Sequence, residues 1–289
     1  MTVLELVRHA SQRLTAAGVS FGHGTSNAFD EAAWLVLWRM GLPLDALDDV
    51  ATQVVQPAQE AAVQELVTTR ISTRKPAAYL TGEAWLQGVP FFVDERVIVP
   101  RSLIAEPLVE GSIDIWLGEH TRQVLDLCTG NGSLAVLAAM AWPDVTVDAA
   151  DVCGDALAVA ARNIARHALQ GRITLHQGNG LAAVAGKRYD LILCNPPYVN
   201  SASIAALPAE YRAEPHLALA GGADGMDFVR TLLAQAPAQM NEDAVLVLEI
   251  GNERAHFDAA FGHLAAVWLP TSAGDDQVLL LTREVLVLG

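Results

Sequence analysis

The first 80 or so residues carry apolar side chains at three- and four-residue steps, the spacing that places them on one face of an α-helix. Leu4, Val7 and Leu14 follow this spacing, and a second run of the same kind begins at Pro57. Glycine-rich stretches separate the runs and break the pattern. The sequence therefore predicts a small helical domain over residues 1–82.

Two further patterns follow. Residues 83–101 are rich in aromatic and β-branched residues around a central glycine and proline, which predicts a β-hairpin linker. From residue 102 to 289, short apolar runs alternate with helical segments, an order typical of a doubly wound α/β sheet with mostly parallel strands. The last two runs are separated too briefly for a parallel crossover, so we expect them to pair antiparallel. The expected strands are 123–127, 145–150, 172–176, 189–194, 244–250, 265–270 and 277–282, and the expected helices lie near 133–142, 155–169, 181–186, 225–240 and 253–263.

Charge and composition narrow the function. The 289 residues carry a formal net charge of −15 and include only two lysines, Lys75 and Lys187. Nucleic-acid binding relies on clustered Lys and Arg, so the charge predicts no direct nucleic-acid partner and favours a basic protein or a cationic ligand. Three cysteines without paired metal-ligand spacing predict no metal site. No apolar run reaches membrane-spanning length and no secretory signal is visible, so we expect a cytoplasmic protein with no membrane partner.

The segment VLDLCTGNGSLAVLA predicts a strand, a glycine turn and a helix. Gly130 and Gly132 allow a ligand to approach the backbone closely, and the helix that follows offers free N–H groups. The same residues, with Ala135, also satisfy the loose dinucleotide fingerprint, and Asp151 at the end of the second strand suits a ribose in either case. Asp126 at the end of the first strand suits an ammonium group and would repel a pyrophosphate, which favours a ligand other than NAD.

A second motif, YDLILCNPPY, ends another apolar strand. Pro197 restricts Pro196 to an extended backbone, so we expect the Pro196 carbonyl to face the crevice beside the side-chain carbonyl of Asn195. Two neighbouring acceptors match the two hydrogens of a planar –NH2 group. Holding both hydrogens would aim the weakly nucleophilic nitrogen lone pair at an electrophile. Tyr198 adds an aromatic wall that favours a planar substrate and a nearby cation.

Together, Asp126-x-x-x-Gly130-x-Gly132 and Asn195-Pro-Pro-Tyr198 resemble the AdoMet-dependent amino methyltransferases, which have a Rossmann-like seven-stranded sheet. Across nearly the whole chain, the helical start, the hairpin and the run LPAEYRAEPHLALAGGADGMDFVR are similar to the bacterial protein-glutamine methyltransferases. Val99-Pro-Arg-Ser102 and the tail GDDQVLLLTRE resemble the branch that acts on the third protein of the large ribosomal subunit. The resemblance thus implies S-adenosyl-L-methionine as cofactor and an unassembled, basic ribosomal protein as partner.

The resemblance also implies residue roles, with methyl transfer by direct displacement that needs no metal. The implied cofactor-binding residues are Asp126, Cys128, Thr129, Gly130, Asn131, Gly132, Asp151, Val152, Asn179 and Asn195. The implied substrate-binding residues are Arg101, Asn195, Pro196, Pro197 and Tyr198, of which Asn195, Pro196 and Tyr198 are also the catalytic residues. For Arg101 an ion pair between domains is an equal alternative, and for Glu214 a role in fixing the loop after the second motif is favoured over substrate contact.

One departure from the family pattern affects the cofactor site. The family usually has Ser-Asp and a large residue after the third strand, where this chain has Gly178, Asn179 and Gly180. Asn179 keeps a carbonyl acceptor for an adenine amino group but lacks the charge, and Gly180 offers adenine no packing surface. We therefore expect weaker AdoMet affinity.

Three other functions stay open at this point. A release-factor glutamine methyltransferase would share the glycine turn and the Asn-Pro-Pro-Tyr motif, but that branch usually carries a proline and an acidic pair directly after the equivalent of Arg101, where this chain has Ser102. A DNA adenine methyltransferase would share the Asn-Pro-Pro-Tyr motif, because adenine also presents a planar –NH2, but the net charge opposes it. A non-enzymatic assembly module with a decayed pocket gains some support from Gly178 and Gly180.

Overall fold

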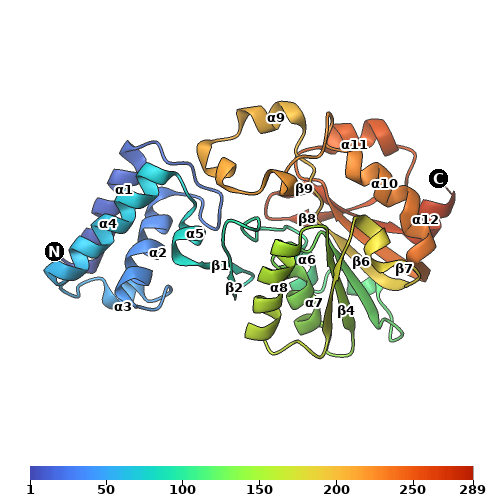
Figure 1. Ribbon diagram of the computed structural model, residues 1–289, viewed down its shortest axis with the longest axis horizontal. Helices are drawn as coiled ribbons and strands as arrows, with labels where there is room; N and C mark the ends of the chain where they lie inside the picture. Colours follow the sequence, from blue (N-terminus) through green and yellow to red (C-terminus); the bar gives the residue numbers. More distant parts are fainter. Residues whose placement is uncertain (289) are drawn as a thin grey trace.

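The computed structural model describes residues 1–288 and combines an N-terminal group of helices, a two-stranded hairpin and an α/β sheet (Figure 1). The helices of the N-terminal group pack around α1, α2 and α4, whose buried side chains include Leu6, Leu35 and Val67. Their apolar core continues into the linker through Val93 and Val99, so the helices and the linker pack together. The elements of this part are α1 (Val3–Ala16), α2 (Ala28–Met40), α3 (Leu47–Val50), α4 (Pro57–Thr73), α5 (Ala77–Thr81), β1 (Glu83–Leu86) and β2 (Val89–Phe92).

The rest of the chain forms a seven-stranded sheet with the order β5-β4-β3-β6-β7-β9-β8. The strands from β5 to β7 are parallel, and β9 runs antiparallel to both β7 and β8. The mostly parallel sheet and its antiparallel last pair are therefore confirmed. The strands are β3 (Gln123–Leu127), β4 (Thr146–Asp151), β5 (Ile173–Gln177), β6 (Tyr189–Cys194), β7 (Met240–Glu249), β8 (Val267–Thr271) and β9 (Gly274–Thr282).

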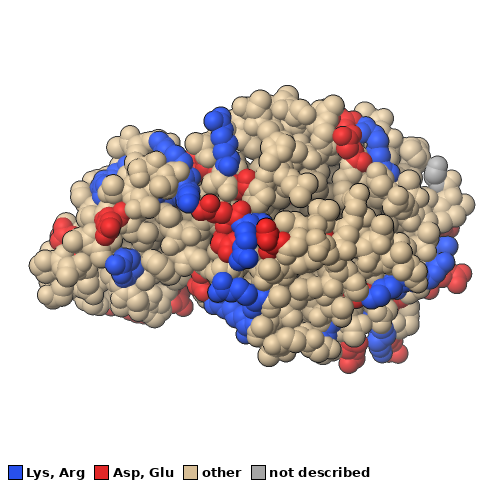
Figure 2. Space-filling view, in the orientation of Figure 1, with Lys and Arg blue, Asp and Glu red and all other residues tan. Residues whose placement is uncertain are grey.

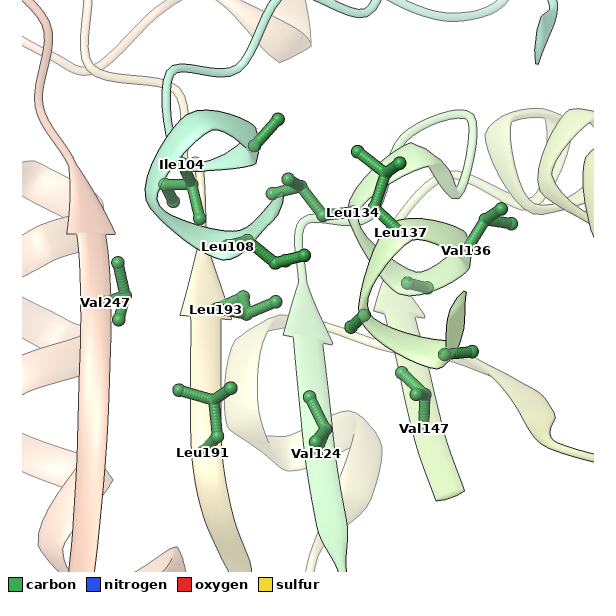
Figure 3. Close-up of a cluster of buried hydrophobic side chains, with 14 of the residues drawn as sticks. Ile104, Leu108, Val124, Leu134, Val136, Leu137, Val147, Leu191, Leu193 and Val247 are labelled. Carbon is green, nitrogen blue, oxygen red and sulfur yellow. The ribbon is translucent and has the colours of Figure 1, made fainter. Parts of the chain in front are cut away.

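Helices cover both faces of this sheet. Figure 3 shows α6 and α7 on one face, where Leu108 lies beside Leu193 of β6; Leu134 of α7 and Val124 of β3 belong to the same buried cluster. The α-helices are α6 (Ala105–Val109), α7 (Ser133–Ala141), α8 (Gly154–Arg166), α9 (Ser201–Ala206), α10 (Asp227–Gln235), α11 (Arg254–Phe261) and α12 (Arg283–Leu288). Shorter 3-10 turns are η1 (Asp114–Trp116), η2 (Gly180–Val184), η3 (Ala209–Ala213), η4 (His216–Ala218) and η5 (Ala236–Gln239). Among the helices of residues 1–288, none is both long and apolar enough to cross a membrane.

The expected helices end one to three residues early at most of their ends, and two of them differ more strongly from the pattern. The helix near 225–240 ends as an α-helix at Gln235, because Pro237 has no N–H to continue the hydrogen-bond ladder and the chain passes into a 3-10 turn. The segment near 181–186 forms only the 3-10 turn η2 before Gly186. In both places the apolar spacing is right, but a helix breaker overrides it.

Candidate active site

The two motifs found in the sequence meet at the centre of the sheet. The glycine turn follows β3 and the Asn-Pro-Pro-Tyr segment follows β6, and these strands are neighbours with Leu127 opposite Cys194. The chain proceeds from β3 to one side of the sheet through β4 and β5, then returns to β6 on the other side. In open α/β sheets, ligands bind at such a reversal, beside the carboxyl ends of the strands. The topology therefore places both motifs at one candidate site.

The glycine turn has a backbone that most residues cannot adopt. Cys128, Gly130 and Gly132 have φ angles of +62°, +54° and +81°, in the left-handed region. A Cβ on Gly132 would lie 3.1 Å from the Cβ of Ala160 in α8, so a side chain there would push the helix away. Both the backbone conformation and the close helix contact therefore require glycine at position 132.

Asp126 is a buried carboxylate beneath this turn. Its Oδ2 accepts hydrogen bonds from the Thr129 hydroxyl and, at 2.9 Å, from the Ala135 N–H. Asp126 is only 1% exposed. Burial raises the pKa of Asp126 to about 7, against the lowering effect of these two hydrogen bonds, and nearby Asp151 raises it further. A cation placed beside this carboxylate would strongly stabilise its ionised form.

Asp151 lies at the end of β4, next to the turn. Its two oxygens accept hydrogen bonds from the Gly130 N–H and the Cys153 N–H, each at 2.9 Å. Each oxygen has a further lone pair, and the residue is partly exposed. Asp151 therefore fixes the turn and can still accept from ligand hydroxyls. Its neighbour Val152 is 47% exposed, an apolar surface at the same edge of the sheet.

Asn131 contributes an unsatisfied donor at the turn. The residue is 2% exposed, and its side-chain Nδ2 has no hydrogen-bond partner among residues 1–288. The backbone carbonyl oxygen of Asn131 accepts a 2.8 Å hydrogen bond from the Asn163 side-chain amide, which also binds the backbone N–H and carbonyl of Phe92 in β2 at 2.7 and 3.0 Å. Asn163 thus joins the hairpin to the glycine turn. Because a buried donor without a partner is costly, the Nδ2 of Asn131 indicates a site that a ligand completes.

The Asn-Pro-Pro-Tyr segment leaves its acceptors free. Within residues 1–288, neither the side-chain amide of Asn195 nor the carbonyl oxygen of Pro196 makes a hydrogen bond. Pro196 is buried, whereas Asn195 and Pro197 are partly exposed. Free acceptors on consecutive residues at the end of β6 are the arrangement that the sequence predicts for holding a planar –NH2 group.

Tyr198 is fixed by a carboxylate that the sequence analysis missed. Its hydroxyl donates a 3.0 Å hydrogen bond to Glu249 Oε1, while Glu249 Oε2 accepts from the Ser102 hydroxyl at 2.6 Å and the Leu103 N–H at 2.9 Å. Burial raises the pKa of Glu249. A Cβ on Gly251 would lie 2.5 Å from the tyrosine ring, so the ring packs directly on backbone. A carboxylate at the end of a buried apolar strand was the signal that could have revealed Glu249.

A cavity of about 250 Å³ lies between η2 and α10, beside Asn179 and Gly180. Phe228 of α10 lines this cavity, and its ring lies 3.9 Å from the position that a Cβ on Gly180 would occupy. The expectation that Gly180 leaves no packing surface is therefore incomplete, because an aromatic ring from another helix lies beside it. The sequence spacing could not reveal this neighbour, which is 48 residues away along the chain.

Arg101 and Glu214 form the ion pair that the sequence left as an alternative. Two guanidinium nitrogens donate to the two carboxylate oxygens, each at 2.7 Å, and Glu214 also accepts from the Val99 N–H at 2.9 Å. Burial opposes ionisation of Glu214, but contacts with His23 and Arg101 outweigh it and lower the pKa to about 2. The role of Glu214 in fixing the loop is thus borne out by these contacts, and about a quarter of the Arg101 side chain stays exposed.

Comparison with known proteins gives relatives that match the chain from end to end. The family model "Methyltransferase small domain" matches residues 113–210. A ribosomal protein uL3 glutamine methyltransferase of Bordetella pertussis is 56% identical over 99% of this chain and 96% of its own length. The protein of the same name from Burkholderia pseudomallei is 52% identical over 97% of this chain and 94% of its own length.

Solved structures support the fold alone. The hMettl16 catalytic domain in complex with MAT2A 3′UTR hairpin 1 is 13% identical, with a TM-score of 0.53 over 81% of this chain and 83% of that one. The same domain in complex with hairpin 6 has a TM-score of 0.52 over 78% of this chain and 81% of that one. This chain therefore shares its fold with those domains.

Proposed function

The chain belongs to the ribosomal protein uL3 glutamine methyltransferase family, and on that premise we propose that it transfers a methyl group from AdoMet to the side-chain amide nitrogen of a glutamine in uL3. The observation that carries this proposal is the pair of free acceptors, Asn195 Oδ1 and Pro196 O, at the end of β6, in a chain that matches its relatives over nearly full length. The net charge of −15 suits a basic protein substrate.

The residues around the glycine turn fit the proposed cofactor. The unpartnered Nδ2 donor of Asn131 marks a place where an acceptor on a ligand, such as a carboxylate, would relieve a cost of folding, and the raised pKa of Asp126 marks a place where a cationic group would do so. We assign the methionine part to the Cys128–Gly132 turn with Asp126 on the ammonium group, the ribose hydroxyls to Asp151, and the adenine to Val152 and Asn179, with the Phe228 ring beside them. Bound AdoMet supplies a methyl group on a positively charged sulfur.

The chain's own contribution to the reaction is positioning. Asn195 Oδ1 and Pro196 O would accept the two amide hydrogens of the glutamine, which turns the nitrogen lone pair out of conjugation and toward the methyl group. Tyr198, held by Glu249, would form one wall of the amide pocket, with Pro197 beside it. Arg101, fixed by Glu214, would border the path of the protein substrate. Methyl transfer from a sulfonium group requires no strong general base from the protein.

Mass spectrometry tests the proposal directly. Ribosomal proteins from cells with and without this chain are compared, and purified uL3 and release factor are each incubated with the protein and labelled AdoMet. We expect one added methyl group on a glutamine side chain of uL3 and little transfer to the release factor. Transfer to the release factor alone would contradict the uL3 assignment. A parallel incubation with DNA serves as the third arm, and transfer to DNA adenine with none to either protein would contradict both protein substrates.

The Asn179→Asp variant should bind AdoMet about fivefold more tightly than the wild type. A charged acceptor strengthens a hydrogen bond from the adenine amino group by about 1 kcal/mol relative to a neutral one. Isothermal titration with AdoMet measures the change. The Gln177→Glu variant adds the same charge two residues earlier and should leave affinity within about twofold; equal affinity of wild type and Asn179→Asp would count against the assignment.

AdoMet affinity should fall as the pH drops through about 7. The ionised form of Asp126 attracts the ammonium group, and the raised pKa, about 7, means that protonation begins near neutrality. We expect the dissociation constant to rise toward tenfold per pH unit below pH 7 and to level off above it. In Asp126→Asn, the profile between pH 5.5 and 7.5 should be flat and the affinity low. A wild-type profile as flat as that of the variant would contradict the role of Asp126.

A further inference from the structure

The chain that follows Tyr198 forms a long loop closed at its base. Val199 N–H donates to Leu219 O at 2.8 Å, and Gly221 N–H donates to Val199 O at 2.9 Å, which joins the two ends of the 200–219 loop directly beside the Asn-Pro-Pro-Tyr segment. The loop contains α9, η3 and η4. Figure 1 shows α9 and the turns after it extending from the sheet toward the N-terminal helices.

The far end of the 200–219 loop is anchored in those helices by a buried carboxylate. Glu210 is 2% exposed, and its Oε1 accepts from the Ser20 N–H at 3.1 Å and lies 3.4 and 3.3 Å from the guanidinium groups of Arg70 and Arg74. The guanidinium cations and the Ser20 N–H lower the pKa of Glu210 against the effect of its burial, so the carboxylate is charged.

Arg70 is the centre of this anchor. Its side chain is fully buried, and it also donates to Glu31 Oε1 of α2 at 2.8 Å and to Ser20 O at 3.0 Å. Burying a guanidinium is costly unless each of its donors is paired. Because one of those partners comes from the 200–219 loop, each of the three guanidinium nitrogens of Arg70 has a partner only when the loop is in place.

A second set of contacts reinforces the first. The ring of Tyr211 lies 4.3 Å from the ring of His23, and a Cβ on Gly22 would lie 2.6 Å from the tyrosine hydroxyl. His23 Nε2 in turn lies 3.4 Å from Glu214 Oε2. Figure 2 shows charged side chains of both signs gathered where the helical part meets the rest of the molecule.

From these contacts we propose that the N-terminal helices act as the anchor of the 200–219 loop, and that Glu210, through Arg70 and Arg74, is a positioning residue for the protein substrate. The inference rests on the proposed function, because it assigns the loop to the substrate side of that same site. The loop begins two residues after Tyr198, whereas none of its anchoring contacts touches the glycine turn. The anchor should therefore govern use of the protein substrate and leave cofactor binding alone.

A matched pair of variants tests this role. Glu210→Ala removes the loop's partner of Arg70, and Glu31→Ala removes the partner of Arg70 that lies within the helices; both carboxylates are buried to the same degree. We expect Glu210→Ala to lower kcat/KM for uL3 about tenfold, the size of a lost charge-assisted hydrogen bond. AdoMet affinity should be unchanged. Glu31→Ala should change kcat/KM by less than about threefold, and Glu210→Gln, which keeps the acceptor oxygen, should recover most of the loss.

Amide hydrogen exchange gives a readout that does not depend on the substrate. Glu210→Ala should speed exchange in residues 200–219 and Glu31→Ala should not. If Glu210→Ala does not fold, Arg74→Ala weakens the same contact from a side chain that is one-third exposed, and the same exchange pattern is expected.

Equal exchange and equal kcat/KM in Glu210→Ala and Glu31→Ala would overturn the proposal, and so would a loss of AdoMet affinity in Glu210→Ala. If the wild type fails to methylate uL3, the proposed function fails, while the exchange result still decides whether the helices anchor the loop.

Discussion

Replacing Asn195 by alanine is expected to lower the rate of methyl transfer to uL3 by about 100- to 1,000-fold at saturating AdoMet and uL3, the cost of losing one preorganised polar group that orients the reacting atoms. The side-chain carbonyl of Asn195 has no partner among residues 1–288, so its removal leaves no protein group unsatisfied and should not destabilise the fold. Single-turnover measurement with labelled AdoMet gives the rate directly.

The control for this prediction uses the same substitution elsewhere on the sheet. Asn241 lies at the start of β7, at the amino-terminal end of the parallel strands and so opposite to the site. Its side-chain amide donates to Asp190 at 2.6 Å. Asn241→Ala should transfer methyl groups within about twofold of the wild type. Unchanged transfer by Asn195→Ala would remove Asn195 from the catalytic assignment.

The second large effect is expected at Asp151. Replacing it by alanine removes the acceptor proposed for both ribose hydroxyls, together with the hydrogen bonds from Gly130 and Cys153 that fix the turn. Charge-assisted hydrogen bonds contribute about 1.5–3 kcal/mol each, so AdoMet affinity should fall by about 100-fold or more. Calorimetric titration measures it, and a thermal melt verifies that the variant is folded.

Asp155 provides the matched control for this experiment. It is an exposed carboxylate in the first turn of α8, four residues after Asp151, and its side chain makes no hydrogen bond within the described residues. Asp155→Ala removes the same charge from the same neighbourhood and should bind AdoMet within about twofold of the wild type. Equal losses in the two variants would show that long-range charge, and not the ribose contact, sets the affinity.

The sequence predicted the sheet well because its strands are buried on both faces. Continuous apolar runs gave β3 and β6 their observed bounds, Gln123–Leu127 and Tyr189–Cys194. It also predicted where the chemistry gathers, since motifs at the carboxyl ends of parallel strands come to one edge. Helix ends were predicted less accurately where a helix-breaking residue interrupts the apolar spacing, as Pro237 does.

The parts of the site that sequence reasoning missed depend on contacts between distant segments. Phe228 lies beside Gly180 only because α10 packs near η2, and Glu210 meets Arg70 across 140 residues. Neither contact leaves a trace in spacing or periodicity. Glu249 differs, because a carboxylate that ends the apolar run AVLVLE marks a buried charge and predicts a partner such as Tyr198.

The central claim is that Asn195 and Pro196 hold a glutamine carboxamide by its two hydrogens. A crystal structure of the protein with S-adenosylhomocysteine and a uL3 fragment that contains the target glutamine tests it most directly. We predict that the amide nitrogen lies about 3 Å from both Asn195 Oδ1 and Pro196 O. An amide nitrogen bound elsewhere, with these two oxygens facing solvent, would contradict the account.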